Sequence, residues 1–327
     1  MAKDKVRWAM LCTARINRAV IPPIRASARS ELVAVGSRSL ETGQAYARKW
    51  DIPRAHGSYD ALLADPEVDA VYIGLPNGQH AEWAIRCAEA GKHVLCEKPL
   101  ATTVEDAERM YGAAQRHGTV LAEAFMYRHH PQTHLVFDLI NQGRIGPVRV
   151  VHGNFSFFLE PGDDIRLNPK LDGGSLWDLG CYPVSYTRTM LGQEPVEVIG
   201  RQHVTAEGVD TTFAGMLRFP SGALAVFDCG FRAPDRWGME FVGEEGSLNI
   251  PSPFKPTASD YVTLRRGGTS ENITAPPMEL YFGEIEDMAD AILNGKPSLI
   301  SREDSVAGIR SLVALYQSAR EGRPVAL

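Results

Sequence analysis

The sequence lacks the features that would mark a secreted, membrane-bound or nucleic-acid-binding protein. Its five cysteines are an odd, scattered set without a Cys-x-x-Cys pair, which favours reduced thiols over a disulfide framework. No uncharged apolar run approaches the roughly 18 residues of a membrane span, and no apolar signal region follows the charged N-terminus. A formal net charge of −6 provides no overall basic field for nucleic acid or an anionic membrane. These absences predict a soluble, cytoplasmic protein.

Two common catalytic patterns are also absent. His129, His130 and His134 suggest a metal site, but Pro131 makes a continuous helix through them improbable. No carboxylate or cysteine completes the ligand set, so we expect no metal. A Gly-x-Ser-x-Gly nucleophile elbow does not occur, which leaves a serine hydrolase unsupported.

Length and composition indicate a globular protein of more than one domain. Hydrophobic residues make up 44% and charged residues 23% of the chain, which is ordinary for a folded protein. At 327 residues the chain is longer than one hydrophobic core usually serves, so two domains are expected.

The first 124 residues alternate between apolar strand patterns and helical patterns. Strands are predicted at 6–11, 31–36, 69–74, 93–96 and 119–124, and helices at 16–27, 40–50, 77–90 and 103–117. This alternation predicts a doubly wound parallel sheet, in which ligands bind outside the carboxyl ends of the strands.

Beyond about residue 125 the pattern changes to strands joined by turns. Strands are predicted at 148–158, 197–204, 211–219, 224–231 and 239–242, and helices at 131–141, 176–191, 283–293 and 302–321. Turn sequences such as Pro220-Ser221-Gly222 predict antiparallel hairpins. We therefore expect a first domain at 1–124 and a second at 125–327, with a C-terminal helix able to pack back on the first domain.

The loop after the first strand lacks the glycines that commonly bind a dinucleotide. A Gly-x-Gly-x-x-Gly fingerprint lets bare backbone approach the pyrophosphate. None of the three glycine positions is a glycine in the segment Cys12-Thr13-Ala14-Arg15-Ile16-Asn17. Alanine at the second position is a small change, whereas cysteine at the first is awkward in a tight turn. The next helix N-terminus can still hold an anion, and the candidate cofactor contacts here are Thr13, Ala14, Arg15 and Ile16.

The end of the second strand indicates which cofactor would bind. Ser37 and Arg38 stand where an acidic residue would hold a free ribose 2′-hydroxyl. A hydroxyl and a guanidinium suit a 2′-phosphate, because arginine makes paired charge-assisted bonds to phosphate oxygens. The pair favours NADP, with NAD as the other possibility. The alternative reading is that Arg38 is a surface arginine before a helix.

Three motifs contain the remaining candidate residues and resemble a known family. They are Glu97-Lys98-Pro99 after one strand, Pro76-Asn77-Gly78-Gln79-His80 after the strand before it, and Gly173-Gly174 through Tyr182 in the second domain. Together they resemble the Gfo/Idh/MocA oxidoreductase family over essentially the whole chain. The resemblance implies an α/β protein with an N-terminal Rossmann domain and a C-terminal α+β domain built on a large, open, mainly antiparallel sheet.

The same resemblance implies roles for individual residues. Lys98 would be catalytic, and the peptide bond before Pro99 would be cis. The segment Asp178-Leu179-Gly180-Cys181-Tyr182 replaces the family's Asp-x-Gly-x-x-x-His, and is similar to the branch with glucose–fructose oxidoreductase, D-xylose 1-dehydrogenases, dimeric dihydrodiol dehydrogenases and some nucleotide-sugar 3-ketoreductases. Further cofactor contacts are expected at Leu75, Pro76, Asn77, His80, Glu97 and Lys98. Substrate contacts are expected at Lys98, Tyr127, Arg166, Asp178 and Tyr182.

The chemistry of alcohol oxidation agrees with these residue types. A nicotinamide takes the hydride, and the protein must move the hydroxyl proton. An unperturbed tyrosine has a pKa of about 10, but a neighbouring ammonium favours the phenolate and lowers that pKa. We expect Tyr182 to be the acid/base, with Lys98 polarising the substrate oxygen and tuning the phenol. Asp178 would orient the substrate or Lys98.

The sequence therefore predicts an NADP-dependent oxidoreductase acting on a sugar or sugar-like alcohol, in the first place an aldose 1-dehydrogenase. A nucleotide-sugar 3-ketoreductase is an alternative that an excess of cations around Arg166 and Arg232 would favour, and a trans-dihydrodiol dehydrogenase would need an apolar pocket. The missing glycines keep open a non-catalytic, NADP-sensing regulatory protein. A homodimer or homotetramer is expected through the broad sheet of the second domain.

Overall fold

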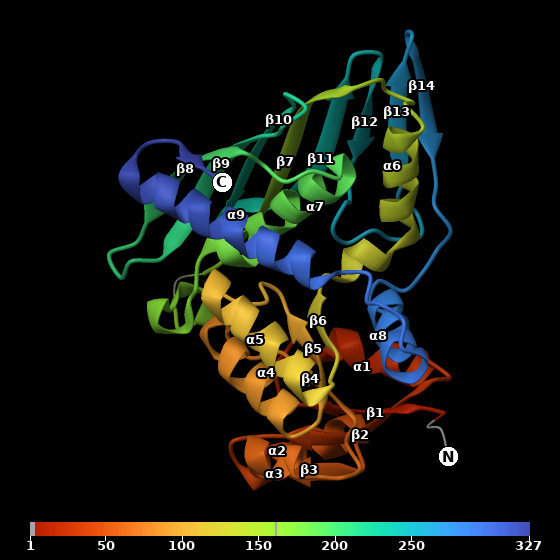
Figure 1. Ribbon diagram of the computed structural model, residues 1–327, viewed down its shortest axis with the longest axis vertical. Coiled ribbons are helices and arrows are strands. Elements are labelled where there is room, and N and C mark those ends of the chain that lie inside the picture. The colour runs from red at the N-terminus through yellow and green to blue at the C-terminus, as the bar shows by residue number, and fades with distance from the viewer. Residues whose placement is uncertain (1–3, 161) are drawn as a thin grey trace. The chain divides into compact units, whose positions relative to one another are not determined.

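The computed structural model describes residues 4–160 and 162–327, and the chain forms two compact units (Figure 1). The first unit extends to Met126 and also includes Tyr281–Val306. The second unit contains Tyr127–Leu280 and Ala307–Leu327. The first break lies close to the division expected after residue 124, whereas the segment Tyr281–Val306 returns to the first unit.

The first unit is built on a six-stranded parallel sheet with the order β3-β2-β1-β4-β5-β6. Its strands are β1 (Val6–Met10), β2 (Ser30–Gly36), β3 (Arg54–His56), β4 (Ala70–Ile73), β5 (His93–Glu97) and β6 (Leu121–Ala124). Its helices include α1 (Asn17–Ala26), α2 (Leu40–Trp50), α3 (Tyr59–Leu63), α4 (His80–Glu89), α5 (Val104–His117) and α8 (Phe282–Asn294). The predicted doubly wound sheet is confirmed, and its order reverses between β1 and β4, where such sheets bind their ligands.

Helix α8 belongs to the first unit although it follows the whole second sheet in sequence. Its apolar face contributes Ile285 and Met288 to the buried cluster that contains Trp8 of β1. Its polar face forms an ion pair between Glu286 and Arg29. One apolar face and one polar face explain why this helix needs a partner, and the first sheet's core provides it.

The second unit is built on a nine-stranded sheet with the order β14-β13-β12-β11-β7-β10-β9-β8-β15. All neighbouring pairs are antiparallel except β7 and β10, which are parallel. The strands are β7 (Val148–Phe158), β8 (Glu197–Val204), β9 (Asp210–Arg218), β10 (Leu224–Gly230), β11 (Arg232–Gly243), β12 (Gly246–Ile250), β13 (Val262–Arg266), β14 (Thr269–Ile273) and β15 (Val325–Ala326). The mainly antiparallel second sheet is therefore confirmed.

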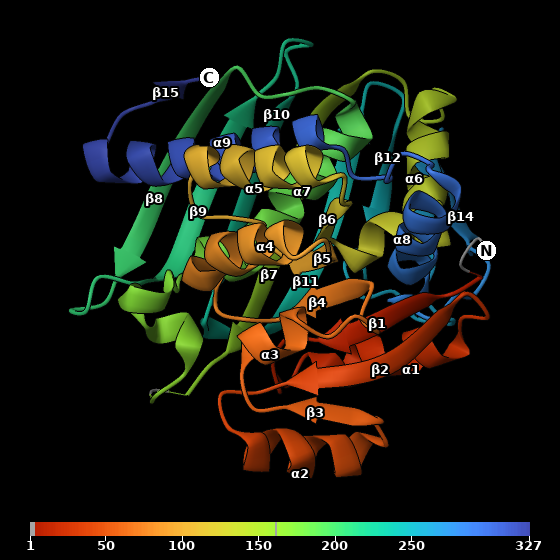
Figure 2. The same ribbon diagram turned by 60° about the horizontal axis from the view of Figure 1, so that its bottom comes forward.

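Helices cover one face of this second sheet, as Figure 2 shows for α7 and α9. The longer helices are α6 (Pro131–Asn141), α7 (Cys181–Leu191) and α9 (Arg302–Glu321), and a π-helix at Leu176–Gly180 precedes α7. On β10, Ala225 and Phe227 are buried toward the helices, whereas Leu224 and Val226 are exposed on the other face. No helix within the described ranges combines the length and apolarity needed to cross a membrane.

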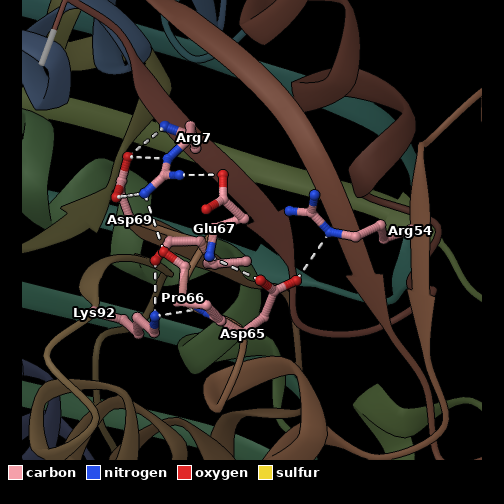
Figure 3. Close-up of polar contacts among 8 residues, drawn as sticks. Arg7, Arg54, Asp65, Pro66, Glu67, Asp69 and Lys92 are labelled. Carbon is pink, nitrogen blue, oxygen red and sulfur yellow. Dashed lines mark hydrogen bonds and ion pairs between the residues drawn. The ribbon is translucent and has the colours of Figure 1, made fainter.

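A polar network joins the amino-terminal ends of the first sheet's strands (Figure 3). Arg7 of β1 donates two hydrogen bonds to Asp69, at 2.9 and 2.8 Å. The buried ammonium of Lys92 donates to the carbonyl oxygens of Asp65 and Val68, at 2.7 and 2.8 Å. Ligands of parallel sheets bind at the opposite, carboxyl ends of the strands, so we assign this network to stability.

We predict that Asp65→Asn destabilises the first unit by about 1–3 kcal/mol at pH 7, because the carboxylate accepts charge-assisted hydrogen bonds. Burial, which would raise the pKa of Asp65, is outweighed by the Glu67 N–H and by His56 and Arg54, so its pKa is lowered. A lowered folded pKa stabilises fully above the ordinary aspartate pKa of about 3.9, and the effect is lost as pH falls through the lowered value.

Urea unfolding at several pH values would measure this difference. The gap between wild type and Asp65→Asn should be constant from pH 7 to about pH 5 and close below about pH 4. Glu67→Gln, at a 59% exposed side chain, is the control and should change stability little. A gap that persists unchanged at pH 3 would contradict the assignment.

Candidate active site

The turn between β1 and α1 is compatible with a nucleotide despite its missing glycines. Among the described non-glycine residues, only Asp51 and Asp172 have positive φ, so Cys12 needs no left-handed conformation. The side chain of Asn17, at the third glycine position, donates to the Cys12 carbonyl oxygen at 2.6 Å and closes the turn. The turn that glycine residues form in other dinucleotide-binding proteins is therefore stabilised here by the hydrogen bond from the Asn17 side chain.

The charge of this turn also fits a phosphate. Burial raises the pKa of the Cys12 thiol to about 11, so the thiol is neutral at pH 7. Thr13, Ala14 and Ile16 are half-buried, and Arg15 is exposed. The first turn of α1 contains no acidic residue. No carboxylate of the turn or of this first turn would therefore repel a pyrophosphate near the helix N-terminus.

Arg38 is placed to recognise a charged group near this turn. Ser37 is buried at the end of β2, and Arg38 after it is exposed. The positive charge of Arg38 lowers the pKa of the Cys12 thiol, against the larger effect of burial, so the guanidinium lies near the nucleotide turn. Within the described part of the chain, Arg38 has no hydrogen bond or ion pair that would occupy it.

The backbone around Lys98 is held by buried partners. The Lys98–Pro99 peptide bond is cis, as the family resemblance implies. The Glu97 carboxylate accepts a hydrogen bond from the Tyr72 hydroxyl and another, at 3.3 Å, from the Lys98 N–H. On the other side of the proline, the Leu100 N–H donates to Glu123 at 2.9 Å.

His80 connects the two loops of this site rather than facing a ligand. Its side chain is fully buried, and its ring nitrogens lie 2.9 Å from the carbonyl oxygens of Leu75 and Pro99. Burial lowers the pKa of His80, with a smaller contribution from the charge of Lys98. We therefore propose that His80 positions Lys98, in place of the cofactor contact expected from the sequence. Cofactor contacts of Leu75, Pro76, Asn77 and Glu97 stay predictions.

In the second unit, a buried carboxylate caps the segment that contains Asp178 and Tyr182. Asp210, at the start of β9, accepts from the Ser175 hydroxyl at 2.6 Å and from the Leu176 N–H at 2.9 Å. Its other oxygen accepts from the Tyr316 hydroxyl of α9 at 2.5 Å. Leu176 begins the π-helix, so Asp210 satisfies a backbone donor that a helix end leaves unpaired.

Steric contact explains why residue 174, just before this cap, is a glycine. Gly174 has a φ of +143°, and a Cβ there would lie 2.3 Å from the Asp210 carboxylate. The Asp178 N–H donates to the Gly174 carbonyl oxygen at 3.0 Å, which starts the π-helix at a defined place. The π-helix was predicted as part of one continuous helix at 176–191. Such insertions are frequent at functional sites.

Asp178 is paired with an arginine in the structure. The Arg166 Nε donates to Asp178 at 2.8 Å, and Arg166 Nη1 lies 3.3 Å from Asp164. Asp178 and Asp164 both raise the pKa of Arg166, with Asp178 the larger cause. One guanidinium thus serves two carboxylates, and Asp178 is held in a fixed orientation.

Tyr182 lies in the first turn of α7 and is held by aromatic rings. Its ring centroid is 5.2 Å from Phe155, 5.3 Å from Phe254 and 5.9 Å from Tyr127. Tyr127 is fully buried and donates its hydroxyl to Ser185 at 2.8 Å. The observed role of Tyr127 is to pack against Tyr182, and its expected substrate contact stays a prediction.

The structure thus brings Asp178, Arg166 and the Tyr182 segment together in the second unit, and it gathers Lys98 with His80 and Glu97 in the first. Sequence analysis assigned no role to Asp210, Glu123 or Tyr316. Asp210 and Tyr316 belong to no motif, and Glu123 only begins the segment 123–132 that resembles the family branch; each acts through a buried contact with a segment distant in sequence. An aspartate at a strand start carries no signal by itself.

A doubly wound sheet with an anion-compatible turn at its switch point defines the class of nucleotide-dependent dehydrogenases. Residues 6–125 match the model of the Gfo/Idh/MocA oxidoreductase family with its NAD-binding Rossmann fold, and residues 134–249 match a C-terminal domain of that family. The chain belongs to the Gfo/Idh/MocA family and is an NAD(P)-dependent oxidoreductase. The non-catalytic alternative is therefore not supported.

Several relatives are similar to this chain over nearly their whole length. The D-xylose 1-dehydrogenase (NADP(+)) 2 of Haloferax volcanii is 40% identical over 98% of this chain and 99% of its own. The aldose-aldose oxidoreductase of Caulobacter crescentus, solved with glycerol, has a TM-score of 0.91, 29% identity, and coverage of 99% and 100%. A 3-ketoreductase of Actinomadura kijaniata, solved with NADP and TDP-benzene, has a TM-score of 0.90, 32% identity, and coverage of 96% and 98%.

Proposed function

We propose that the protein is an NADP-dependent aldose 1-dehydrogenase, which oxidises a free sugar at its anomeric carbon. The observation that carries this choice is the pairing of Arg166 with Asp178 and Asp164 in the substrate-binding unit. The full-length similarity to a D-xylose 1-dehydrogenase supports it. The ion pairs of Arg166 support an uncharged substrate, and the sequence similarity supports oxidation at the anomeric carbon.

The residues of the chain account for the proton that must move during this reaction. NADP, when bound, accepts the hydride, so the protein must take the proton of the sugar hydroxyl. Tyr182 takes that proton. Lys98 polarises the oxygen of the sugar hydroxyl. Asp178, held by Arg166, orients the sugar.

The 3-ketoreductase of Actinomadura kijaniata supports the assignment of Lys98 and Tyr182. Structures of that enzyme include one with a lysine replaced by alanine and one with a tyrosine replaced by phenylalanine. These two positions have the same separation in sequence as Lys98 and Tyr182 have here. A lysine and a tyrosine at this spacing were thus the residues chosen for replacement in that relative.

Local charge favours a neutral sugar over a nucleotide-linked one. A diphosphate needs cations, but Arg166 already serves two carboxylates, and Arg232 donates to the Leu159 carbonyl oxygen at 3.0 Å. The surrounding segment adds further acids, with no matching excess of bases, at Glu160, Asp163 and Asp172. A dihydrodiol is the second candidate, because the indole of Trp237 is 37% exposed, contacts the Phe155 ring that packs on Tyr182, and provides apolar surface.

The open face of the second sheet supports an oligomer. Leu224 and Val226 of β10 are 38% and 36% exposed on the face away from the helices. Apolar strand residues on an uncovered face are best buried by a second copy, so we propose a homodimer or homotetramer through this sheet.

We predict that wild-type protein reduces NADP with D-xylose or D-glucose, and that Tyr182→Phe lowers kcat by about 10²–10⁴-fold, the usual contribution of an acid/base. The measurement is NADPH absorbance over a panel of free aldoses, polyols and dihydrodiols. Tyr186→Phe, one turn along α7 in the same aromatic cluster, is the matched control and should keep its activity. Near-normal turnover by Tyr182→Phe would rule out its assignment, and activity confined to dihydrodiols would replace the aldose.

Arg38→Ala should raise the Kd of NADPH by about ten- to a hundredfold, because a charge-assisted hydrogen bond contributes about 1.5–3 kcal/mol. The Kd of NADH, which has no 2′-phosphate, should change by less than about threefold on the same substitution. Fluorescence titration measures both. The control is Arg48→Ala, which replaces an exposed arginine on α2, the helix that follows Arg38. Equal weakening of both cofactors would show that Arg38 does not read the 2′-phosphate.

Sedimentation equilibrium at micromolar concentration should give a multiple of the 35.9 kDa chain mass. Val226→Glu should shift the protein toward the monomer, because it buries a charge in the proposed interface. Leu40→Glu, at a 49% exposed leucine of the first unit, is the control and should leave the mass unchanged. A monomeric wild type would refute the oligomer.

A further inference from the structure

Trp237 is exposed on a face where its neighbours are buried. It is 37% exposed, whereas Met239 and Phe241, two and four residues further along β11, are 2% and 0% exposed. Side chains alternate along a strand, so these three residues point to the same face of the second sheet. In register, Trp237 lies opposite Phe155 of β7, whose ring packs toward Tyr182. The indole therefore lies on the helix-covered face, where the cover ends.

A single buried ring separates Trp237 from Tyr182. Phe155 meets Trp237 edge to face with centroids 6.2 Å apart, and it meets Tyr182 edge to face at 5.2 Å. Phe155 is 3% exposed, so it is a core residue that fixes the positions of both neighbours. The indole and the Tyr182 ring are thus held against one common ring.

An ammonium group lies beside the same ring. Lys255 Nζ is 5.6 Å from the Phe155 centroid, and the Lys255 side chain is exposed. Its loop is fixed by Phe254, which is fully buried and stacks on Phe155 at 5.1 Å, and by the buried prolines Pro253 and Pro256. An exposed indole, an ammonium and a phenol therefore surround one buried phenylalanine.

A bulge in β11 directs this strand end. The pairing of β11 with β7 is irregular between Arg232 and Arg236, and regular from Arg236 to Val242. Bulges bend a strand and re-aim side chains, and they are over-represented next to active sites. Leaving a tryptophan partly in water on the buried face of a sheet forgoes apolar burial, which a ligand at that place would restore.

We propose that Trp237 is the platform on which the carbon skeleton of the substrate packs, with Lys255 hydrogen-bonding a hydroxyl at the end of the sugar away from Tyr182. This rests on the proposed aldose oxidation at Tyr182. An aldose ring has C–H faces that suit an aromatic surface and hydroxyls that suit an ammonium, the mixture of contacts that small-ligand sites provide. A dihydrodiol shares the apolar face but has no hydroxyl at its far end for Lys255.

The test measures KM and kcat of Trp237→Ala, Trp237→Phe and Lys255→Met with D-xylose as substrate. Trp237→Ala should raise KM about tenfold with kcat changed less than about threefold, because tenfold corresponds to about 1.4 kcal/mol, which lies near the upper end of what aromatic packing contributes. Trp237→Phe, which keeps a ring, should stay within about threefold of wild type. Phe137→Ala, at a 39% exposed aromatic residue of α6, is the matched control and should leave KM unchanged. The Kd of NADPH should be unaltered in all four variants.

Direct binding separates the failure of this inference from the failure of the proposed reaction. Saturation-transfer NMR with D-xylose should show binding to wild type and to Trp237→Phe, and a loss of signal in Trp237→Ala. An unchanged KM and an unchanged NMR signal in a folded Trp237→Ala would overturn the platform. Binding that depends on Trp237 without any NADP reduction would support the platform and refute the reaction. If Lys255→Met weakened the binding of a dihydrodiol as much as it weakened the binding of D-xylose, the proposed role of Lys255 would be overturned.

Discussion

The chemistry of the second unit depends on the Asp210 carboxylate. Three donors converge on it, from Ser175, Leu176 and Tyr316, and all come from segments that must be fixed before Asp178 can be placed. Without this acceptor, a buried hydroxyl and a helix-end N–H would be unpaired, at a cost of about 1–3 kcal/mol each. Because the π-helix starts at this cap, Asp210 helps to determine the positions of Asp178 and of the first turn of α7, although it lies outside the motif that contains them.

In the first unit, buried acceptors also hold the backbone around Lys98. Glu97 and Glu123 accept backbone N–H groups on either side of Pro99, and His80 ties that turn to the loop after β4. In both units, buried acceptors fix the backbone around the residues proposed for catalysis. A site built in this way keeps its groups oriented before a substrate arrives, which is what precise proton transfer requires.

The fold class could be predicted from the sequence because the spacing of apolar residues along the chain indicates which segments form strands and which form helices. The alternation up to residue 124 and the strand-rich middle predicted the two kinds of sheet, although β3 and β12 to β15 had no predicted counterpart. Helices such as Pro131–Asn141 matched their predicted bounds. At the candidate site, sequence motifs single out Lys98 and Asp178, and the roles expected of these two residues stay predictions. The π-helix and the cap at Asp210 could not be predicted, since each arises from contacts between segments far apart in sequence. A C-terminal helix that packs back on the first unit, as α8 does, was expected. The Asn17 bond that replaces glycine freedom is local, but a missing glycine gives no sign of what replaces it.

The two units also divide the tasks of recognition. The residues suited to a nucleotide lie in the first unit, on β1, β2 and their loops, whereas Arg166, Asp178 and Tyr182 lie in the second. The charge of Arg166 is the strongest constraint there, because two carboxylates already balance it. An anionic substrate would meet the excess negative charge of two carboxylates around one guanidinium, whereas a neutral sugar can add hydrogen bonds to these groups without that repulsion. The arrangement thus favours neutral substrates through its local charge.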